Sequence, residues 1–175
     1  MKIIEIIFSS YFIQNITMAM LESDFHEFLE ELVEVPYRIA IPTYNRPEIL
    51  VNKTLSYLDR CVVDRNNIDV FVEDTEQLQL YLATCGAEYP QLNYIITHTQ
   101  GICEKRNFIR HYYAMENYNR YTFCLDDDID TVMRKDKTEE NDLEDFIMRG
   151  FLECDNVGAT LFGISPLHNE FFLRD

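Results

Sequence analysis

The stretch YTFCLDDDID, residues 121–130, joins a short apolar segment to three consecutive aspartates, with a fourth aspartate at Asp130. The aromatic and apolar residues at 121–125 predict a buried strand. Carboxylates this close together disfavour joint ionisation unless a cation or basic groups neutralise them. Mg²⁺ and Mn²⁺ prefer such oxygen ligands. The stretch therefore predicts a strand that ends in a metal-binding turn, and a solvated acidic loop is the alternative.

Strand and helix patterns alternate through the rest of the chain. Further β-rich runs occur at residues 38–41, 69–72, 94–97 and 159–164. Apolar residues at helical spacing predict helices that begin at 47, follow 74, and cover 103–115 and 143–154. The helix after Asp74 is expected to pack through Leu78, Tyr81 and Leu82, with Gln77 as a capping partner. This alternation predicts an α/β fold, with a mainly parallel sheet of five strands flanked by helices.

Polar residues follow three of the predicted strands. In parallel sheets, ligands bind beyond the carboxyl ends of the strands. We therefore expect the strand ends at Ile41, Val72 and Leu125 to open on one crevice. The polar and turn residues that follow these ends are Pro42, Thr43, Tyr44, Arg46, Glu73, Asp74, Asp126, Asp127 and Asp128.

The start of the helix at 103–115 carries a second kind of signal. Gly101 precedes it, and Lys105, Arg106 and Asn107 lie in its first turns. Backbone N–H groups and the helix dipole favour an anion at this position, and basic side chains add charge-assisted contacts to phosphate or ribose. An exposed, solvated basic turn is the alternative.

The composition predicts one globular domain with a local extension. With 175 residues and 47% hydrophobic residues, the chain is long enough to bury a core. We assign residues 1–35 to an N-terminal extension with an amphipathic helix at 23–33, and residues 36–175 to the main domain. A net charge of −16 repels nucleic acid, so a DNA partner needs a local basic surface. The candidates for that surface are Arg106, Arg110, His111, Arg134, Lys135 and Lys137.

Cysteine usage and hydropathy bear on the compartment. The five cysteines are scattered and form no C-x-x-C pair, which argues against a disulfide framework and a zinc site. Each is expected to be a small core residue in a reducing compartment. The apolar first twenty residues include Lys2, Glu5, Gln14 and Asn15, so no transmembrane anchor is expected. We therefore expect a cytoplasmic protein, located in the host cytoplasm or nucleus if it is viral.

Four motifs in this order resemble the GT-A glycosyltransferases. They are IAIPTYNRPEILVNKTLSYL at 39–58, IDVFVED at 68–74, GICEKRNFIR at 101–110 and YTFCLDDDID at 121–130. The similarity extends over about 38–172, including GISPLHNEFF at 163–172. Within this group, the chain most resembles the DNA-base glycosyltransferases associated with the TET/JBP hydroxylases of phages and large viruses. The resemblance implies a Rossmann-like GT-A domain.

The resemblance also implies roles for particular residues. The nucleoside of a UDP-sugar would lie against Pro42, Thr43, Tyr44, Arg46, Glu73 and Asp74, with Arg106, Asn107 and Asp127 also at the nucleotide. The Asp-x-Asp element matches Asp126 and Asp128. Asp126 would face the ribose or the metal, and Asp128 would bind the Mn²⁺ or Mg²⁺. The implied reaction transfers a hexose, glucose first among them, to a hydroxylated acceptor such as hydroxymethylated pyrimidine in DNA. A glycan, lipid or protein acceptor is the alternative.

The C-terminal part departs from the GT-A pattern. These enzymes normally continue past the equivalent of Asp175 with acceptor-binding elements and, in inverting members, the carboxylate base. Those parts are not found, so we expect a C-terminally incomplete domain that binds donor better than it turns over. A fragment, a truncated gene product and a minimal, non-catalytic nucleotide-sugar-binding module all stay open. The sequence assigns no catalytic base.

Overall fold

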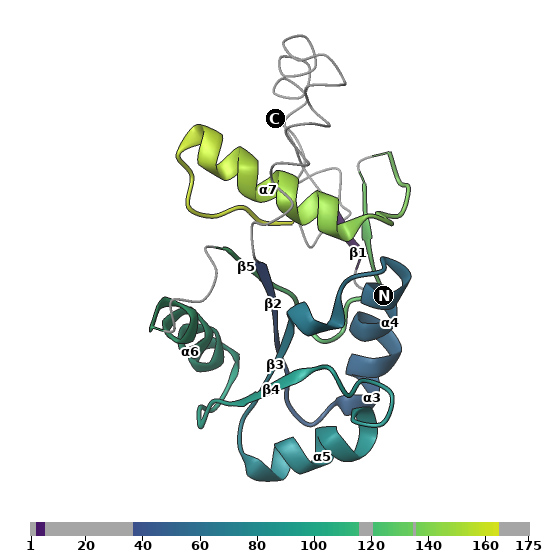
Figure 1. The fold of residues 1–175 in the computed structure, drawn as a ribbon, viewed down its shortest axis with the longest axis vertical. Coiled ribbons are helices and arrows are strands. Elements are labelled where there is room, and N and C mark those ends of the chain that lie inside the picture. The colour runs from purple at the N-terminus through teal and green to yellow at the C-terminus, as the bar shows by residue number, and fades with distance from the viewer. Residues whose placement is uncertain (1–2, 6–36, 116–120, 135, 165–175) are drawn as a thin grey trace.

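A four-stranded parallel sheet forms the centre of the molecule, with strand order β4-β3-β2-β5 (Figure 1). The computed structural model describes residues 3–5, 37–115, 121–134 and 136–164. The strands are β2 (Tyr37–Pro42), β3 (Ile68–Val72), β4 (Asn93–Ile96) and β5 (Tyr121–Cys124). The α/β class and the mainly parallel sheet are thus confirmed, as are four of the five predicted strands.

Helices cover both faces of this sheet. In chain order they are α3 (Pro47–Leu50), the π-helical turn η1 (Val51–Leu55), α4 (Ser56–Arg60), the 3₁₀ turn η2 (Arg65–Asn67), α5 (Thr75–Cys85), α6 (Ile102–Met115) and α7 (Leu143–Val157). Pro47 occupies the first turn of α3, where its missing N–H is of no consequence. The four predicted helices are confirmed, the first of them as the continuous run α3, η1 and α4.

The hydrophobic core has two parts because alternate residues of a strand point to opposite faces. On one face, Ile39, Ile41 and Val70 pack with side chains from α3 to α5 and from α7. On the other face, Ala40 and Phe71 pack with the α6 residues Ile109 and Tyr113. Every residue of β3 is buried, as expected for a central parallel strand covered on both sides.

A polar network closes the amino-terminal edge of the sheet. Asp69 is 2% exposed and accepts hydrogen bonds from Arg38 Nε at 2.8 Å and Asn93 Nδ2 at 2.9 Å. The Tyr113 hydroxyl also donates to this carboxylate, at 2.6 Å. The buried charge is therefore fully engaged in tying β2, β3, β4 and α6 together at the end of the sheet opposite its carboxyl ends.

The predicted fifth strand, at 159–164, is wrong. The chain there is irregular, and it follows Gly158, which ends α7 in the left-handed conformation with φ 68°. Phe162 instead packs over Gly150 of α7, where an added Cβ would lie 2.6 Å from the ring, and it contacts Phe151 and Phe123. The packing of Phe162 therefore anchors this segment, which pairs with no strand of the described structure.

Two short strands were not predicted. β1 (Ile3–Glu5) and β6 (Thr131–Met133) pair in parallel as a separate two-stranded sheet. Runs of three residues are too short to give a clear alternation of apolar and polar side chains. The predicted amphipathic helix at 23–33 lies outside the described residues.

Three expectations about single side chains also need correction. Leu82 is 47% exposed, because the packed face of α5 runs through Tyr81 and Cys85 and leaves Leu82 at its margin. Cys103 and Cys124 are exposed, since one lies in the first turn of α6 and the other ends β5, an outer strand of the sheet. The other three cysteines are buried, as expected.

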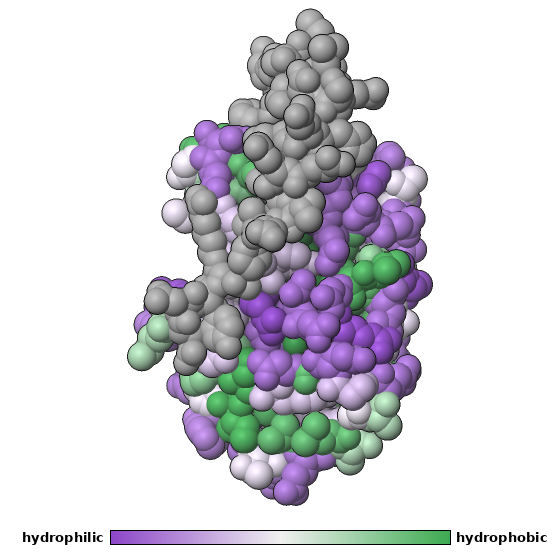
Figure 2. Space-filling view, viewed as in Figure 1, coloured by the Kyte–Doolittle hydropathy of each residue, from purple (hydrophilic) through white to green (hydrophobic). Residues whose placement is uncertain are grey.

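The visible surface is largely hydrophilic. In Figure 2, hydrophobic residues gather low in the view, in the region where Figure 1 shows α5. No helix within the described part of the chain is long and apolar enough to cross a membrane.

Candidate functional site

A pocket of about 790 Å³ opens at the carboxyl ends of β2, β3 and β5. Its lining residues are Pro42, Thr43, Tyr44, Arg46, Glu73, Gln100, Gly101, Ile102, Lys105, Arg106, Asp126, Asp127 and Asp128. Glu73 and Asp128 therefore share one pocket, and the predicted convergence of the strand ends on one crevice is confirmed. The volume falls within the range of pockets that hold small-molecule ligands.

Two residues assigned to the nucleotide from sequence do not line this pocket: Asp74 and Asn107. Asp74 caps α5, where its Oδ1 accepts a hydrogen bond from Gln77 N at 2.8 Å. Asn107 is an exposed residue of α6. Lys105 lines the pocket instead, because consecutive helical residues point about 100° apart and three in a row cannot all face one side.

The loop after β2 is held in place from several directions. Thr43 is 3% exposed, its N–H donates to Phe71 O at 3.1 Å, and its hydroxyl lies 2.6 Å from the Tyr81 hydroxyl. Asn45 adopts a left-handed conformation with φ 53°, which asparagine tolerates, and its N–H donates to Gln77 Oε1 at 2.8 Å. Gln77 thus anchors this loop with its side chain, while its backbone N–H is the capping partner of Asp74, as expected.

The turn at residues 126–129, called the aspartate turn below, is held in place by two hydrogen bonds with the Thr54 hydroxyl. The fully buried Thr54 hydroxyl donates to Asp126 O at 2.8 Å and accepts from Ile129 N at 3.0 Å. Thr54 belongs to η1, and π-helical turns of this kind are frequent at functional sites. The helix after Pro47 therefore determines the shape of the turn that carries the carboxylates.

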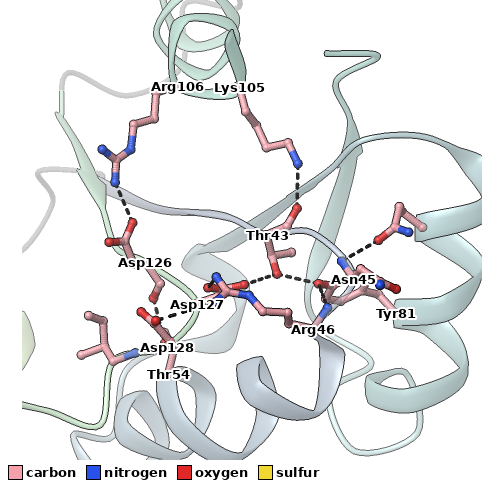
Figure 3. A network of polar contacts seen from close by, with 12 residues as sticks. Thr43, Asn45, Arg46, Thr54, Tyr81, Lys105, Arg106, Asp126, Asp127 and Asp128 are labelled. Carbon is pink, nitrogen blue, oxygen red and sulfur yellow. Dashed lines mark hydrogen bonds and ion pairs between the residues drawn. The ribbon is translucent and has the colours of Figure 1, made fainter. Parts of the chain in front are cut away.

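Asp127 is the buried member of the aspartate turn. It is 1% exposed, accepts a hydrogen bond from Thr43 Oγ1 at 2.5 Å, and pairs with Arg46 (Figure 3). Burial raises the pKa of Asp127, while the Thr43 hydroxyl and Arg46 act in the opposite direction. These contacts make Asp127 a support that joins the aspartate turn to the loop after β2.

Asp126 and Asp128 are the more accessible carboxylates, with side chains 41% and 19% exposed. Arg106 Nη2 lies 2.6 Å from Asp126 Oδ1, and Arg46 Nη1 lies 3.7 Å from Asp128 Oδ2. Two pairs of an arginine and a carboxylate therefore lie at this side of the pocket. Such an arrangement suits a ligand that brings both negative charge for the arginines and positive charge for the aspartates.

Lys105 lines the pocket, although the family resemblance gave it no role at the nucleotide. It is 3% exposed, and its ammonium donates to Thr43 O at 2.7 Å and lies 5.7 Å from the centre of the Tyr44 ring. Burial lowers the pKa of Lys105, and the negative charges of Glu73, Asp127 and Asp74 oppose this effect. The direction in which the Lys105 side chain points depends on the residue at which α6 begins, and the sequence does not determine that residue.

The chemistry of the donor set fits a divalent cation held by few protein ligands. Among the described residues, no group of three or more histidine, cysteine, aspartate or glutamate side chains is arranged to enclose a metal. Mg²⁺ typically takes only one or two carboxylates, with water and substrate phosphates completing its shell. Asp126 and Asp128, two residues apart on one turn, fit that type of site.

The candidate DNA-facing residues do not form one surface in the described structure. Arg134 pairs with the buried Glu140 at 2.7 Å, and Arg106 pairs with Asp126. The segment after β6 and helix α6 lie on opposite sides of the molecule in Figure 1. Lys135 lies outside the described residues.

Comparison of the chain with protein-family models, with curated proteins and with solved structures finds no match.

Proposed function

We propose that this chain is a GT-A-type, metal-dependent hexosyltransferase that binds a nucleotide-sugar, UDP-glucose first among the candidates. The observation that carries the proposal is the meeting of three elements in one pocket: the loop after β2, the first turn of α6 and the aspartate turn. The first supplies an exposed aromatic ring, the second basic side chains and the third carboxylates. A nucleoside diphosphate with a bound divalent cation offers a complementary group to each: the base, the phosphates and the cation.

In this proposal Asp126 and Asp128 hold Mn²⁺ or Mg²⁺. When bound, the metal supplies Lewis-acid stabilisation of the negative charge that develops on the leaving diphosphate. Arg46 and Arg106 lie beside these carboxylates and are placed to contact phosphate oxygens. Asp127 keeps the turn in position through Thr43 and Arg46.

The acceptor is a hydroxylated molecule, and hydroxymethylated pyrimidine in DNA is one candidate. A net charge of −16 and the separation of the basic residues favour the second candidate, an uncharged glycan acceptor. Incubation with UDP-glucose, Mn²⁺ and each acceptor, followed by mass spectrometry, distinguishes the two. The hexose is expected on one class of acceptor. Absence of product with every acceptor would favour a binding module that does not catalyse transfer.

Metal-dependent nucleotide binding is tested most directly with Asp128→Asn. Calorimetric titration of UDP should show binding to the wild-type chain in Mn²⁺ and much weaker binding in a chelator. In Asp128→Asn we expect a loss of at least about tenfold in UDP affinity in Mn²⁺, because one of two anionic metal ligands becomes neutral.

The matched control is Asp130→Asn. Asp130 lies two residues further on, pairs with Lys53 at 3.2 Å and does not line the pocket. This variant should bind UDP and Mn²⁺ as the wild type does. Undiminished Mn²⁺-dependent binding in Asp128→Asn would contradict the proposed metal site, whereas equal losses in both variants would point to a general effect of charge.

A further inference from the structure

β4 forms an outer edge of the central sheet, because it pairs with β3 on one side and with no other strand of the described structure. Thr97 N donates to Val72 O at 2.9 Å, so the backbone of Thr97 faces β3. The backbone N–H and C=O groups of alternate residues in a strand point to opposite edges. Those of Tyr94 and Ile96 therefore point away from β3, toward the open edge. Such an edge is a ready template for a further strand.

The chain around this edge carries almost no charge. Between residues 77 and 103, Glu88 is the one aspartate, glutamate, lysine or arginine, although these four types make up 26% of the whole sequence. That stretch covers most of α5, all of β4 and the loops on either side of β4. Soluble proteins commonly protect a sheet edge with charged side chains or proline, and β4 contains neither. Depletion of charge is instead typical of the centre of a protein–protein interface.

Incompletely buried apolar side chains lie on both sides of this edge. Leu82 of α5 is 47% exposed, and Cys85, on the same side of that helix, interacts with Tyr94 of β4. On the other face of the sheet, Ile95 and the α6 residue Phe108 are only partly buried. Figure 2 shows hydrophobic residues gathered low in the view, where Figure 1 places α5 and β4.

We propose that this chain forms a twofold-symmetric dimer in which the β4 edges of two copies pair in antiparallel orientation. A twofold axis at Ile95 places Tyr94 of each copy opposite Ile96 of the other, so that the outward backbone groups of both residues pair. A four-residue strand cannot by itself bury the roughly 800 Å² per partner of a standard interface. The exposed apolar side chains of α5 therefore belong to the interface as well.

The distribution of charge favours a second copy over a different partner. Each copy carries a net charge of −16, so two copies can meet only through a surface that keeps their carboxylates apart. The β4 edge is such a surface. The opposite outer strand, β5, is followed by the aspartate turn and would bring like charges together. A basic peptide, which the net charge would attract, finds no carboxylate on β4 to pair with.

Sedimentation equilibrium of the wild-type chain, from about 1 to about 100 µM, tests for the dimer. In about 200 mM NaCl, which screens long-range repulsion, the mass should rise with concentration from 20.8 kDa to twice this value. Leu82→Glu should weaken the dimer by about tenfold or more, because it places two like charges in the interface.

The matched control is Val157→Glu, which adds the same charge at a residue that is 57% exposed. Val157 ends α7, and Figure 1 shows α7 and α5 at opposite ends of the molecule. This variant should dimerise as the wild type does. A wild-type chain that stays monomeric at every concentration would overturn the inference and leave the β4 edge to a different partner. Equal dimerisation of Leu82→Glu and the wild type would overturn the assignment of the interface.

Amide hydrogen exchange distinguishes strand pairing from contact through α5 alone. The Tyr94 and Ile96 N–H groups should exchange at least about tenfold more slowly in the dimer than in the monomer. Ile96→Pro removes an N–H that points to the open edge, keeps the pairing with β3, and should prevent dimerisation. Ile96→Ala shortens the same side chain but keeps this N–H, so it should still dimerise. A dimer in which both amides exchange as they do in the monomer would contradict the pairing of the β4 edges.

Discussion

Thr54 shows how one buried hydroxyl can control a functional turn. It satisfies a carbonyl at one end of the aspartate turn and an N–H at the other, at 2.8 and 3.0 Å. Thr54→Val keeps the shape of the side chain but leaves both backbone groups without this partner. We expect the free energy of unfolding to fall by about 2 kcal/mol, measured by urea denaturation, because an unsatisfied buried polar group costs about 1–3 kcal/mol. Mn²⁺-dependent UDP binding should weaken in parallel.

The control for this change is Thr84→Val on the exposed side of α5, where the hydroxyl donates to Leu80 O within the same helix. Its effect on the free energy of unfolding should stay within about 0.5 kcal/mol. A Thr54→Val chain as stable as the wild type would show that the aspartate turn holds its shape without the hydroxyl.

The sequence alone predicts the positions of some side chains at the pocket better than those of others. Asp126, Asp127 and Asp128 could be placed at the pocket because they directly follow an apolar strand, and strand ends in a parallel sheet share one edge. Lys105 and Asn107 could not be distinguished, because a shift of one residue in the start of α6 rotates each side chain by about 100°. The support by Thr54 depends on a contact between residues more than seventy positions apart, which no local pattern reveals.

At the scale of elements, two adjacent acidic residues at the junction between β3 and α5 have different roles. Glu73 lines the pocket, whereas the next residue, Asp74, caps the helix. Asp74→Ala should lower the free energy of unfolding by about 1 kcal/mol, the usual effect of losing an N-cap, and leave UDP affinity unchanged. Glu73→Gln should do the reverse, with stability retained and UDP affinity lowered by about tenfold.

Chemical denaturation and calorimetry on both variants provide the measurement, and each variant is the other's control. A large loss of UDP affinity in Asp74→Ala at unchanged stability would return Asp74 to the binding site, as the family resemblance implied.

Helices and strands can be predicted from the sequence where the periodic pattern of apolar residues is long. α7 was predictable because five apolar residues form one stripe along the helix, and all five are buried: Leu143, Phe146, Ile147, Phe151 and Cys154. The segment at 159–164 has the composition of a strand, but its placement depends on a close approach between Phe162 and Gly150. Such a tertiary contact overrides a local preference. The π-helical turn at 51–55 also has no simple local signature.

At the scale of the whole molecule, electrostatic repulsion should limit stability. The chain carries 31 acidic and 15 basic side chains, and exposed ion pairs such as that of Arg60 with Glu139 contribute little. Screening should therefore relieve more repulsion than it removes attraction. We expect the thermal unfolding midpoint to rise by a few degrees as NaCl increases from about 10 to about 200 mM at pH 7.

Repeating the salt titration at a lower pH provides the control. Near pH 4.5, the isoelectric point of the sequence, the net charge approaches zero and the effect of NaCl should largely disappear. A midpoint that falls with salt at pH 7 would show that the ion pairs around the pocket outweigh the repulsion.

The divergence of Lys105 and Arg106 bears on how this site can evolve. The two residues are adjacent in the gene, yet their side chains reach separate walls of the pocket. A substitution at codon 105 can alter the contact with the loop after β2 without touching the groups beside the aspartates, and a substitution at codon 106 can do the opposite. Selection can therefore change one wall of the pocket in a single mutational step while the neighbouring wall is preserved.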